Sequence, residues 1–208
     1  MPNLDLQAVD LSCATDLEYR ALVDLRNRLW AESDPDDPPK SFGWWKRSWA
    51  SLPAHLERHC WFVWQDGRQE LKAYGSLFFA HLDTNQHLCW CDLGVLPEFR
   101  RLGIGRALLE VMLSVARENK RSVLLGFTQE TVPAGEVFAQ HLGAEAASGG
   151  RIGLSLKDWI GVCSSGGFRS RPEIRSSWAS GRVRTQKNTC QPCANSGRCW
   201  PTHHHVMA

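Results

Sequence analysis

The stretch VLPEFRRLGIGRALL, residues 95–109, decides how this chain folds. Pro97 ends an extended segment, and a loop with glycines at 103 and 105 opens a long run with helical hydrophobic spacing. Backbone N–H groups at a helix start lack intrahelical acceptors and, with the positive end of the helix dipole, attract phosphate oxygens. Glycine leaves room for a pyrophosphate and allows positive φ. Three neighbouring side chains add positive charge: Arg100, Arg101 and Arg106. By itself, this pattern indicates either a phosphate site or a solvated helix start.

Regular patterns on both sides of this loop predict an α/β domain. Helical spacing predicts helices over residues 17–30, 41–52, 103–119 and 133–142, the first capped by Thr15 or Asp16. The acidic, proline-rich residues 32–39 cannot continue the first helix and are expected to form a loop. Apolar and aromatic runs predict strands over residues 59–64, 71–82, 87–95, 122–127 and 151–156. Turn residues such as Asp66-Gly67 join the first three strands as hairpins. We therefore expect a mixed, mostly antiparallel central sheet with helices on both faces, and a strand over 122–127 that is buried on both faces.

Composition divides the 208 residues near position 158. Every leucine precedes Lys157, and the segment from Trp159 onward is rich in Ser, Gly, Arg and Cys. That segment carries seven Lys or Arg against Glu173 alone, a charge of +6, so the net charge of +2 leaves −4 for residues 1–158. An acidic body does not favour nucleic acid as a partner. We predict one domain over residues 1–158 and a basic, poorly ordered tail over residues 159–208.

The placement of the cysteines and of the apolar runs limits which metal sites and cellular locations the sequence favours. Four cysteines lie among apolar neighbours and are expected to be small core residues: Cys13, Cys60, Cys89 and Cys91. Cys190, Cys193, Cys199 and His203 are zinc-ligand types, but their spacing matches no established zinc site, so no metal is predicted. No apolar run approaches the roughly 20 residues of a membrane span, and the N-terminus lacks a signal-peptide layout. We expect a cytoplasmic protein without membrane contact.

The full stretch resembles the cofactor motif of the GNAT superfamily of N-acyltransferases, Val-x-Pro-x-x-Arg-x-x-Gly-x-Gly followed by Ala-Leu-Leu. The matching positions are Val95, Pro97, Arg100, Gly103, Gly105 and residues 107–109. Residues 138–143 are similar to the family's later helix, and the resemblance covers residues 5–158. Residues 26–29, 34–39 and 132–136 are similar to bacterial tandem-domain GNAT proteins. One hypothesis is therefore that the tail is a remnant of a second domain, and a homodimer would cover the face that such a loss exposes.

The resemblance implies an N-acetyltransferase that moves an acetyl group from acetyl-CoA, a co-substrate, to a primary amine of a small molecule or peptide by direct attack. Main-chain groups of Leu93 and Val95 would hold the thioester carbonyl, with the N–H of Val95 polarising its oxygen. The implied cofactor-binding residues are Leu93, Val95, Arg100, Arg101, Leu102, Gly103, Ile104, Gly105, Arg106 and Phe138.

The attacking amine must lose its proton, because an alkyl ammonium has a pKa of about 10.4. Asp92, the only carboxylate in residues 87–95, is the first candidate base, and Glu130 is the second. The alternative for Asp92 is a structural carboxylate paired with an arginine or a backbone amide. Three histidines are expected to be surface or locally satisfied residues: His81, His87 and His141.

One position departs from the family. Many members place a tyrosine, acting as general acid, at the position that Ala139 occupies here. The second functional hypothesis is therefore a non-catalytic acetyl-CoA-binding domain, and a third is an adaptor that binds nucleic acid through its basic tail.

Two features of the sequence are candidates for the acceptor site, and each also has a purely structural interpretation. The tryptophans at 44, 45 and 49 shape either a pocket or a core, and the acidic loop over residues 34–37 either attracts an amine or is simply solvated.

Truncation after Trp159 is expected to leave the melting temperature and acetyl-CoA binding nearly unchanged. The tail has little apolar area, so its burial would hardly offset roughly 1–2 kcal/mol of backbone ordering per residue. Solubility is expected to rise, because exposed thiols at 190, 193 and 199 are removed. Thermal unfolding and acetyl-CoA titration of the truncated chain check this. A truncated protein that aggregates or unfolds would show that the tail covers an apolar face.

Overall fold

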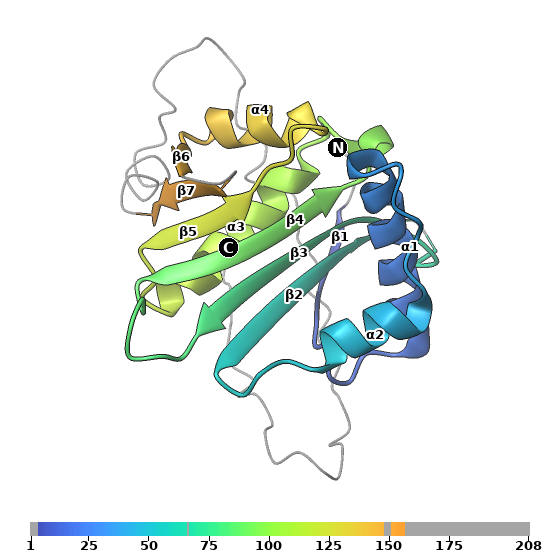
Figure 1. Ribbon diagram of the computed structural model, residues 1–208, viewed down its shortest axis with the longest axis horizontal. Coiled ribbons are helices and arrows are strands. Elements are labelled where there is room, and N and C mark those ends of the chain that lie inside the picture. The colour runs from blue at the N-terminus through green and yellow to red at the C-terminus, as the bar shows by residue number, and fades with distance from the viewer. Residues whose placement is uncertain (1–3, 66, 148–150, 157–208) are drawn as a thin grey trace.

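A seven-stranded sheet forms the centre of the computed structural model, which describes residues 4–65, 67–147 and 151–156. Its strands are β1 (Asp5–Val9), β2 (Leu56–Trp64), β3 (Leu71–Ala80), β4 (Leu88–Val95), β5 (Val123–Phe127), β6 (Glu145–Ala147) and β7 (Arg151–Ser155). They lie in the order β1-β2-β3-β4-β5-β7-β6. Only β4 and β5 are parallel, and all other neighbours are antiparallel (Figure 1). The expected mixed, mostly antiparallel sheet is confirmed.

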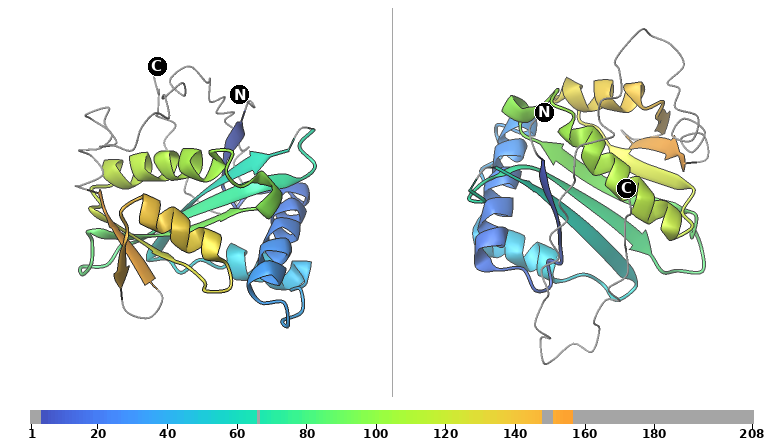
Figure 2. Two further views of the ribbon diagram at one scale, coloured as in Figure 1. Left: turned by 90° about the horizontal axis from the view of Figure 1, so that it is seen from above. Right: turned by 180° about the vertical axis from the view of Figure 1, so that it is seen from behind.

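Helices cover both faces of this sheet, as expected. They are α1 (Asp16–Ser33), α2 (Phe42–Ala50), α3 (Ile104–Glu118) and α4 (Pro133–His141), with a short 3-10 helix, η1 (Pro97–Phe99). Figure 2 shows α1 and α2 on one face and α3 on the other. The parallel arrangement of β4 and β5 requires a crossover, and α3 supplies it. None of the helices that the structure describes is long and apolar enough to cross a membrane.

The core has two parts, one on each face. On the α3 face, Leu108, Met112 and Leu113 of α3 are fully buried against residues of β2 to β5. On the α1 face, Tyr19, Leu22 and Leu25 pack with alternate residues of β2 and β3. Because side chains alternate along a strand, odd-numbered residues of β4 face α3 and even-numbered ones face α1. This alternation places the residues of the site described below.

Three details differ from the sequence expectation. First, α1 continues through Ser33, where a loop was expected; Asp34 ends it because Pro35 follows. Thr15 rather than Asp16 is the N-cap, in a capping box with Glu18. Second, β1 and β6 are additional strands. Third, β5 is not buried on both faces.

In β5, Leu124 and Gly126 are buried, whereas the Phe127 side chain is 65% exposed. The reason is that α1 and α2 do not extend over β5 on their face of the sheet (Figure 1).

Of the four cysteines expected in the core, Cys60 and Cys89 are buried and Cys13 and Cys91 are partly exposed. The predicted turn residue Asp66, the tail and its four cysteines lie outside the described residues.

Candidate functional site

The central feature of the site is a gap between β4 and β5. These strands pair only from Leu88–Val123 to Trp90–Leu125, whereas β4 stays paired with β3 as far as Val95. The last residues of β4 therefore lose their neighbour on one side. Two hydrogen bonds show which main-chain groups face that side. The Leu96 N–H donates toward β3, to Lys72 O at 3.1 Å, whereas His87 O accepts from Ser122 N on the β5 side at 2.9 Å.

Main-chain groups alternate sides along a strand, so odd-numbered residues of β4 direct their N–H and C=O toward the gap. Leu93 and Val95 are the odd-numbered residues beyond the last β4–β5 pair. Their amide groups are thus available to a ligand that enters between the strands. The Val95 carbonyl already accepts from Arg100 Nε at 3.0 Å. The Val95 N–H faces the gap, and its predicted role as donor to a carbonyl oxygen stays a prediction.

At the same edge of the sheet, the start of α3 forms a cradle of backbone N–H groups. Gly103 is the N-cap with φ of 82°, a left-handed conformation that glycine adopts without strain, and no side chain caps this helix end. Ala107 N donates to Gly103 O, the first intrahelical bond. The N–H groups of residues 104–106 therefore lack helical acceptors, and no acidic residue lies in the first turn. A phosphate would be well accommodated here.

Gly105 connects the cradle to the gap. A Cβ at Gly105 would lie 3.6 Å from Phe138 Cζ of α4, 3.6 Å from Val95 Cγ2 and 3.7 Å from Leu93 Cδ2. The structure thus brings four of the predicted cofactor residues to one point. The expectation of positive φ is correct for Gly103 and wrong for Gly105, which is an ordinary helical residue. Gly105 matters because it carries no side chain, not because of its backbone angles.

The three arginines of the loop have different surroundings. Arg100 was expected to add charge near the phosphates, but its guanidinium is paired with Glu32 of α1 at 2.6 and 2.5 Å. Arg106 pairs with Glu110 at 3.1 Å, with both side chains more than half exposed. Arg101 is exposed and has φ of 65°. Arg101 and Arg106 remain the basic side chains open to a ligand, and Arg100 instead ties the loop to α1.

Two other residues predicted to bind the cofactor also differ in exposure. The Ile104 side chain is a core residue, 2% exposed, so only its N–H can face a ligand. Leu102 is 47% exposed at the loop. An exposed leucine beside a glycine-rich helix start is consistent with contact to a bound ligand, but it requires none.

Arg100→Ala is expected to lower the free energy of unfolding by about 1.5–3 kcal/mol, since it removes a two-pronged charged contact that is largely shielded from water. Arg106→Ala is the matched control, because its ion pair is exposed and its loss should cost less than about 0.5 kcal/mol. Urea unfolding of both variants makes the comparison. Equal losses of stability would contradict the role assigned to Arg100.

Asp92, the first candidate base, lies on the α1 face of β4. Its Oδ2 pairs with Arg26 Nη1 at 2.7 Å, and the same nitrogen contacts the hydroxyl of Tyr74. The Arg26 guanidinium also lies over the rings of Trp45 and Tyr74, at 5.1 and 5.0 Å. Pairing with an arginine is the structural alternative that the sequence left open. It does not occupy the second oxygen, because the structure gives Oδ1 no partner among the described residues.

The surroundings of Asp92 favour a reactive carboxylate. Half of the Asp92 side-chain surface is open to solvent, and Arg26 is its charged partner. Burial raises the pKa of Asp92 above its ordinary value of 3.8, and the charge and hydrogen bond of Arg26 oppose that rise. A higher pKa makes the carboxylate a better proton acceptor near neutral pH.

Arg26 and Tyr74 were not predicted. A signal for Arg26 was present in the sequence, because it lies four residues after Leu22 and three before Leu29, on the apolar stripe of α1. A charge on such a stripe indicates a buried partner. Tyr74 had no comparable signal, since an aromatic residue is ordinary in a strand.

The other candidate groups are less well placed. Glu130 is exposed in the turn after β5 and has no hydrogen bond or ion pair within the described part of the chain. His81 contacts Glu57 at 2.6 Å, and His141 contacts its own helix at Val137 O. At position 139, where many GNAT proteins carry tyrosine, Ala139 is a buried core residue. Tyr19, one of two tyrosines in the chain, donates to Leu11 O, far along the sequence from this helix.

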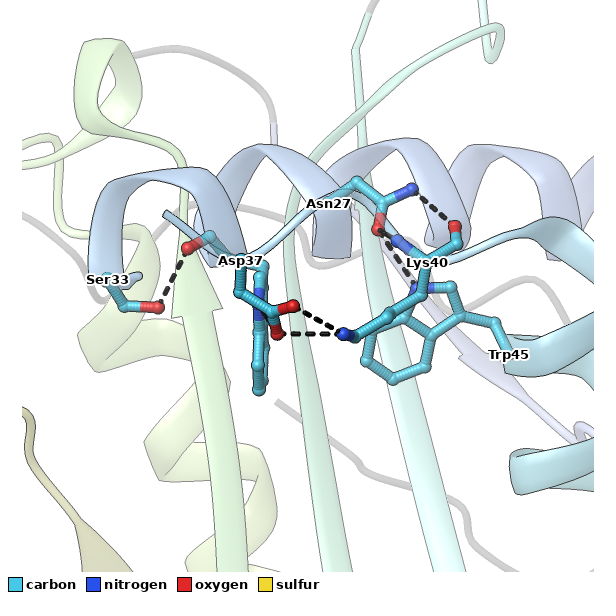
Figure 3. A network of polar contacts seen from close by, with 6 residues as sticks. Asn27, Ser33, Asp37, Lys40 and Trp45 are labelled. Atoms are coloured by element: carbon cyan, nitrogen blue, oxygen red, sulfur yellow. Dashed lines mark hydrogen bonds and ion pairs between the residues drawn. The ribbon is translucent and has the colours of Figure 1, made fainter. Parts of the chain in front are cut away.

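In the acidic loop after α1, Asp34 and Asp36 are exposed, whereas Asp37 is held by contacts to its neighbours (Figure 3). Both oxygens of Asp37 bind Lys40 Nζ, at 2.8 and 2.7 Å, and Oδ2 also accepts from Trp30 Nε1. Asn27 Oδ1 accepts from Lys40 N and from Trp45 Nε1. Asp37 is thus neutralised, and it is not the group that would attract an amine. Trp45 is a core residue, whereas Trp44 is 45% exposed.

Comparison with known proteins connects this geometry to one family. The sequence model described as "Acetyltransferase (GNAT) family" matches residues 19–144. Among solved structures, the chain is similar to a tandem GNAT protein from the clavulanic acid biosynthesis pathway, with 26% identity and a TM-score of 0.56. The match covers 70% of this chain and 45% of that one, so the chain spans less than half of the tandem protein.

Two further structures share the fold. A protein of Streptococcus mutans is 19% identical, with a TM-score of 0.55 and coverage of 73% and 98% of the two chains. The protein yncA of Salmonella typhimurium, solved with its cofactor acetyl-CoA, is 14% identical, with a TM-score of 0.52 and coverage of 83% and 99%. At these identities the similarity concerns the fold alone. A search of curated protein sequences found no match.

Proposed function

This chain belongs to the GNAT family of acetyltransferases, and from that premise we propose that it transfers the acetyl group of acetyl-CoA to a primary amine of a small molecule or peptide. The observation that carries the proposal is the alignment of two features at one edge of the sheet. The uncapped start of α3 offers amides for the pyrophosphate, and the β4–β5 gap exposes the Val95 N–H for the thioester carbonyl. Gly105 places no side chain between them, where an added Cβ would meet Phe138, Val95 and Leu93 at 3.6–3.7 Å.

The residues assigned to acetyl-CoA follow from this arrangement. The N–H groups of residues 104–106 would hold the pyrophosphate, with Arg101 and Arg106 nearby as sources of positive charge. Main-chain groups of Leu93 and Val95 would hold the acyl arm, with the Phe138 ring beside it. The side chains of Arg100 and Ile104 have structural roles, and Leu102 and Gly103 shape the loop.

In the proposed reaction, a bond forms between the amine nitrogen and the thioester carbonyl carbon, and the carbon–sulfur bond breaks. The amine attacks in its neutral form, sulfur leaves as a thiolate, and the nitrogen gives up one proton as the amide forms. Asp92 is the proposed acceptor of that proton, because it is open to solvent on the face opposite α3 and immediately precedes Leu93. A thiol has a pKa of about 8.5, so its thiolate departs without a strong acid. A buried alanine at position 139 is therefore compatible with turnover.

A second candidate function is acetyl-CoA binding without catalysis. The observation that favours it is Ala139, buried where many relatives carry a tyrosine, together with a match to less than half of a tandem protein. Calorimetric titration with acetyl-CoA, paired with thiol-release measurements over a set of amines, separates the two. Binding with amine-dependent thiol release supports the transferase, and binding without release supports the second candidate. Absence of binding contradicts both.

A further inference from the structure

A row of apolar side chains crosses the sheet next to Asp92. The strand registers place Phe78 of β3 opposite Trp90 of β4, and Trp90 opposite Leu125 of β5. Their neighbours Leu77, Cys89 and Leu124 belong to the core on the α3 face, so these three side chains lie on the opposite face. All three are only partly buried. By the same alternation Phe127, two residues after Leu125, lies on this face and is 65% exposed.

This apolar row (Phe78, Trp90, Leu125 and Phe127) is not covered by the helices on its face. Figure 1 shows α1 and α2 toward one side of this face of the sheet, with no helix in front of β5. Arg58 closes the end at β2, because its guanidinium lies 6.0 Å from the Phe78 ring and donates to Trp49 O of α2. Contiguous apolar side chains that stay partly exposed on a folded protein commonly serve recognition.

The described residues leave the acceptor one face of the sheet from which to approach the thioester. On the α3 face, the gap is bordered by α3 and by the side chains of Leu93, Val95 and Phe138, and the proposed acyl arm itself would occupy this side. On the α1 face, Leu29 fills the space above Gly94, where a Cβ would lie 2.4 Å from Leu29 Cδ1. The remaining approach runs over Trp90 and Phe127 to the carboxylate of Asp92, which follows Trp90 by two residues on the same face.

We propose that the apolar row is the acceptor subsite and that the acceptor is a primary amine borne on an apolar, ring-sized group. This inference rests on the proposed transferase function. The ring or branched alkyl group would lie on Trp90 and Leu125 against Phe127, and the nitrogen would lie near Asp92. Small polar amines and polyamines would leave the row exposed to water and gain nothing from it. Contact with the acceptor would explain why a phenylalanine stands exposed at the end of β5, where it contributes little to the core.

The test compares amines in the thiol-release assay at saturating acetyl-CoA. Tryptamine and 2-phenylethylamine are expected to exceed ethanolamine and putrescine in kcat/KM by at least about 10-fold, the discrimination that an apolar pocket can supply. Trp90→Ala and Phe127→Ala are expected to reduce this preference about 10-fold and leave acetyl-CoA affinity unchanged. Phe127→Ala is not expected to destabilise the fold, because Phe127 is mostly exposed. Leu17→Ala is the control, an exposed apolar residue in the first turn of α1.

Equal or greater kcat/KM for ethanolamine or putrescine would overturn the inference and leave the transferase function standing. So would an unchanged preference in both row variants. If no amine releases thiol, 2-phenylethylamine is titrated into the CoA-loaded protein by calorimetry. Binding that Trp90→Ala weakens would then support the subsite while the transferase function fails, and no binding would overturn the subsite as well.

Discussion

Gly105→Val is expected to lower the affinity for acetyl-CoA by at least about 100-fold, a loss of about 2.8 kcal/mol. The reason is steric: a Cβ at this position already meets Phe138, Val95 and Leu93 at 3.6–3.7 Å, and valine adds two methyl groups where the acyl arm must pass. Gly105→Ala should reduce affinity less. It should also preserve or raise stability, because the Cβ makes ordinary contacts and alanine favours a helix by up to about 1 kcal/mol. Calorimetric titration with acetyl-CoA measures the loss.

Gly43→Val provides a matched control for this change. Gly43 is the second residue of α2, as Gly105 is the second residue of α3, and its added Cβ would meet only the flexible end of Arg47. Both substitutions carry a similar helix-propensity effect, but only one lies at the proposed cofactor path. Unchanged acetyl-CoA affinity in Gly105→Val, or an equal loss in Gly43→Val, would show that the loop is not the cofactor site.

Asp92→Asn is expected to reduce kcat/KM by about 10²–10⁴-fold and to leave acetyl-CoA affinity unchanged. Asparagine keeps the shape of the side chain and cannot accept the proton. Burial raises the pKa of Asp92 above 3.8, so the carboxylate becomes protonated at a pH above 3.8 when the pH is lowered. Wild-type activity should therefore decline at that higher pH. That acid limb should disappear in Asp92→Asn. Arg26→Met should move it to higher pH, since Arg26 lowers the pKa of Asp92. A pH–rate profile of the three proteins measures both effects.

Glu130→Gln is the control for Asp92→Asn. Glu130 is the second candidate base, but it is exposed beyond the end of β5, so its substitution should change kcat/KM by less than about 3-fold. A large loss in Glu130→Gln with full activity in Asp92→Asn would assign the base to Glu130. Asp92 would then be the structural partner of Arg26.

The sequence predicted the sheet, the four helices and the position of the glycine-rich loop before α3, because these depend on local periodicity and on a glycine-proline pattern. It did not predict β1 or β6. Both are short strands at the ends of the sheet, and they are defined by pairing with distant residues such as Trp61 and Gly153 rather than by their own composition. The limits of α1 were misjudged because acidic Glu32 was read as part of the proline-rich loop. In the structure it is the helical partner of Arg100.

The site was predictable where it depends on the main chain and less so where side chains from distant elements meet. Leu93, Val95, Gly105 and Phe138 gather as expected because strand alternation and the helix start fix them. The pairing of Asp92 with Arg26 joins β4 to α1, and no local pattern states which arginine will meet which carboxylate. The exposure of Phe127 depends on which strands α1 and α2 cover, a property of the whole sheet.

The structure of this protein crystallised with acetyl-CoA tests the central claim most directly. The account predicts pyrophosphate oxygens within hydrogen-bond distance, about 2.7–3.2 Å, of N–H groups of residues 104–106, and the thioester carbonyl oxygen within the same distance of the Val95 N–H. The methyl end of the acetyl group should emerge on the face that carries Asp92 and Trp90. Acetyl-CoA bound anywhere else on the sheet, or bound at the loop with its carbonyl oxygen away from Val95, would contradict it.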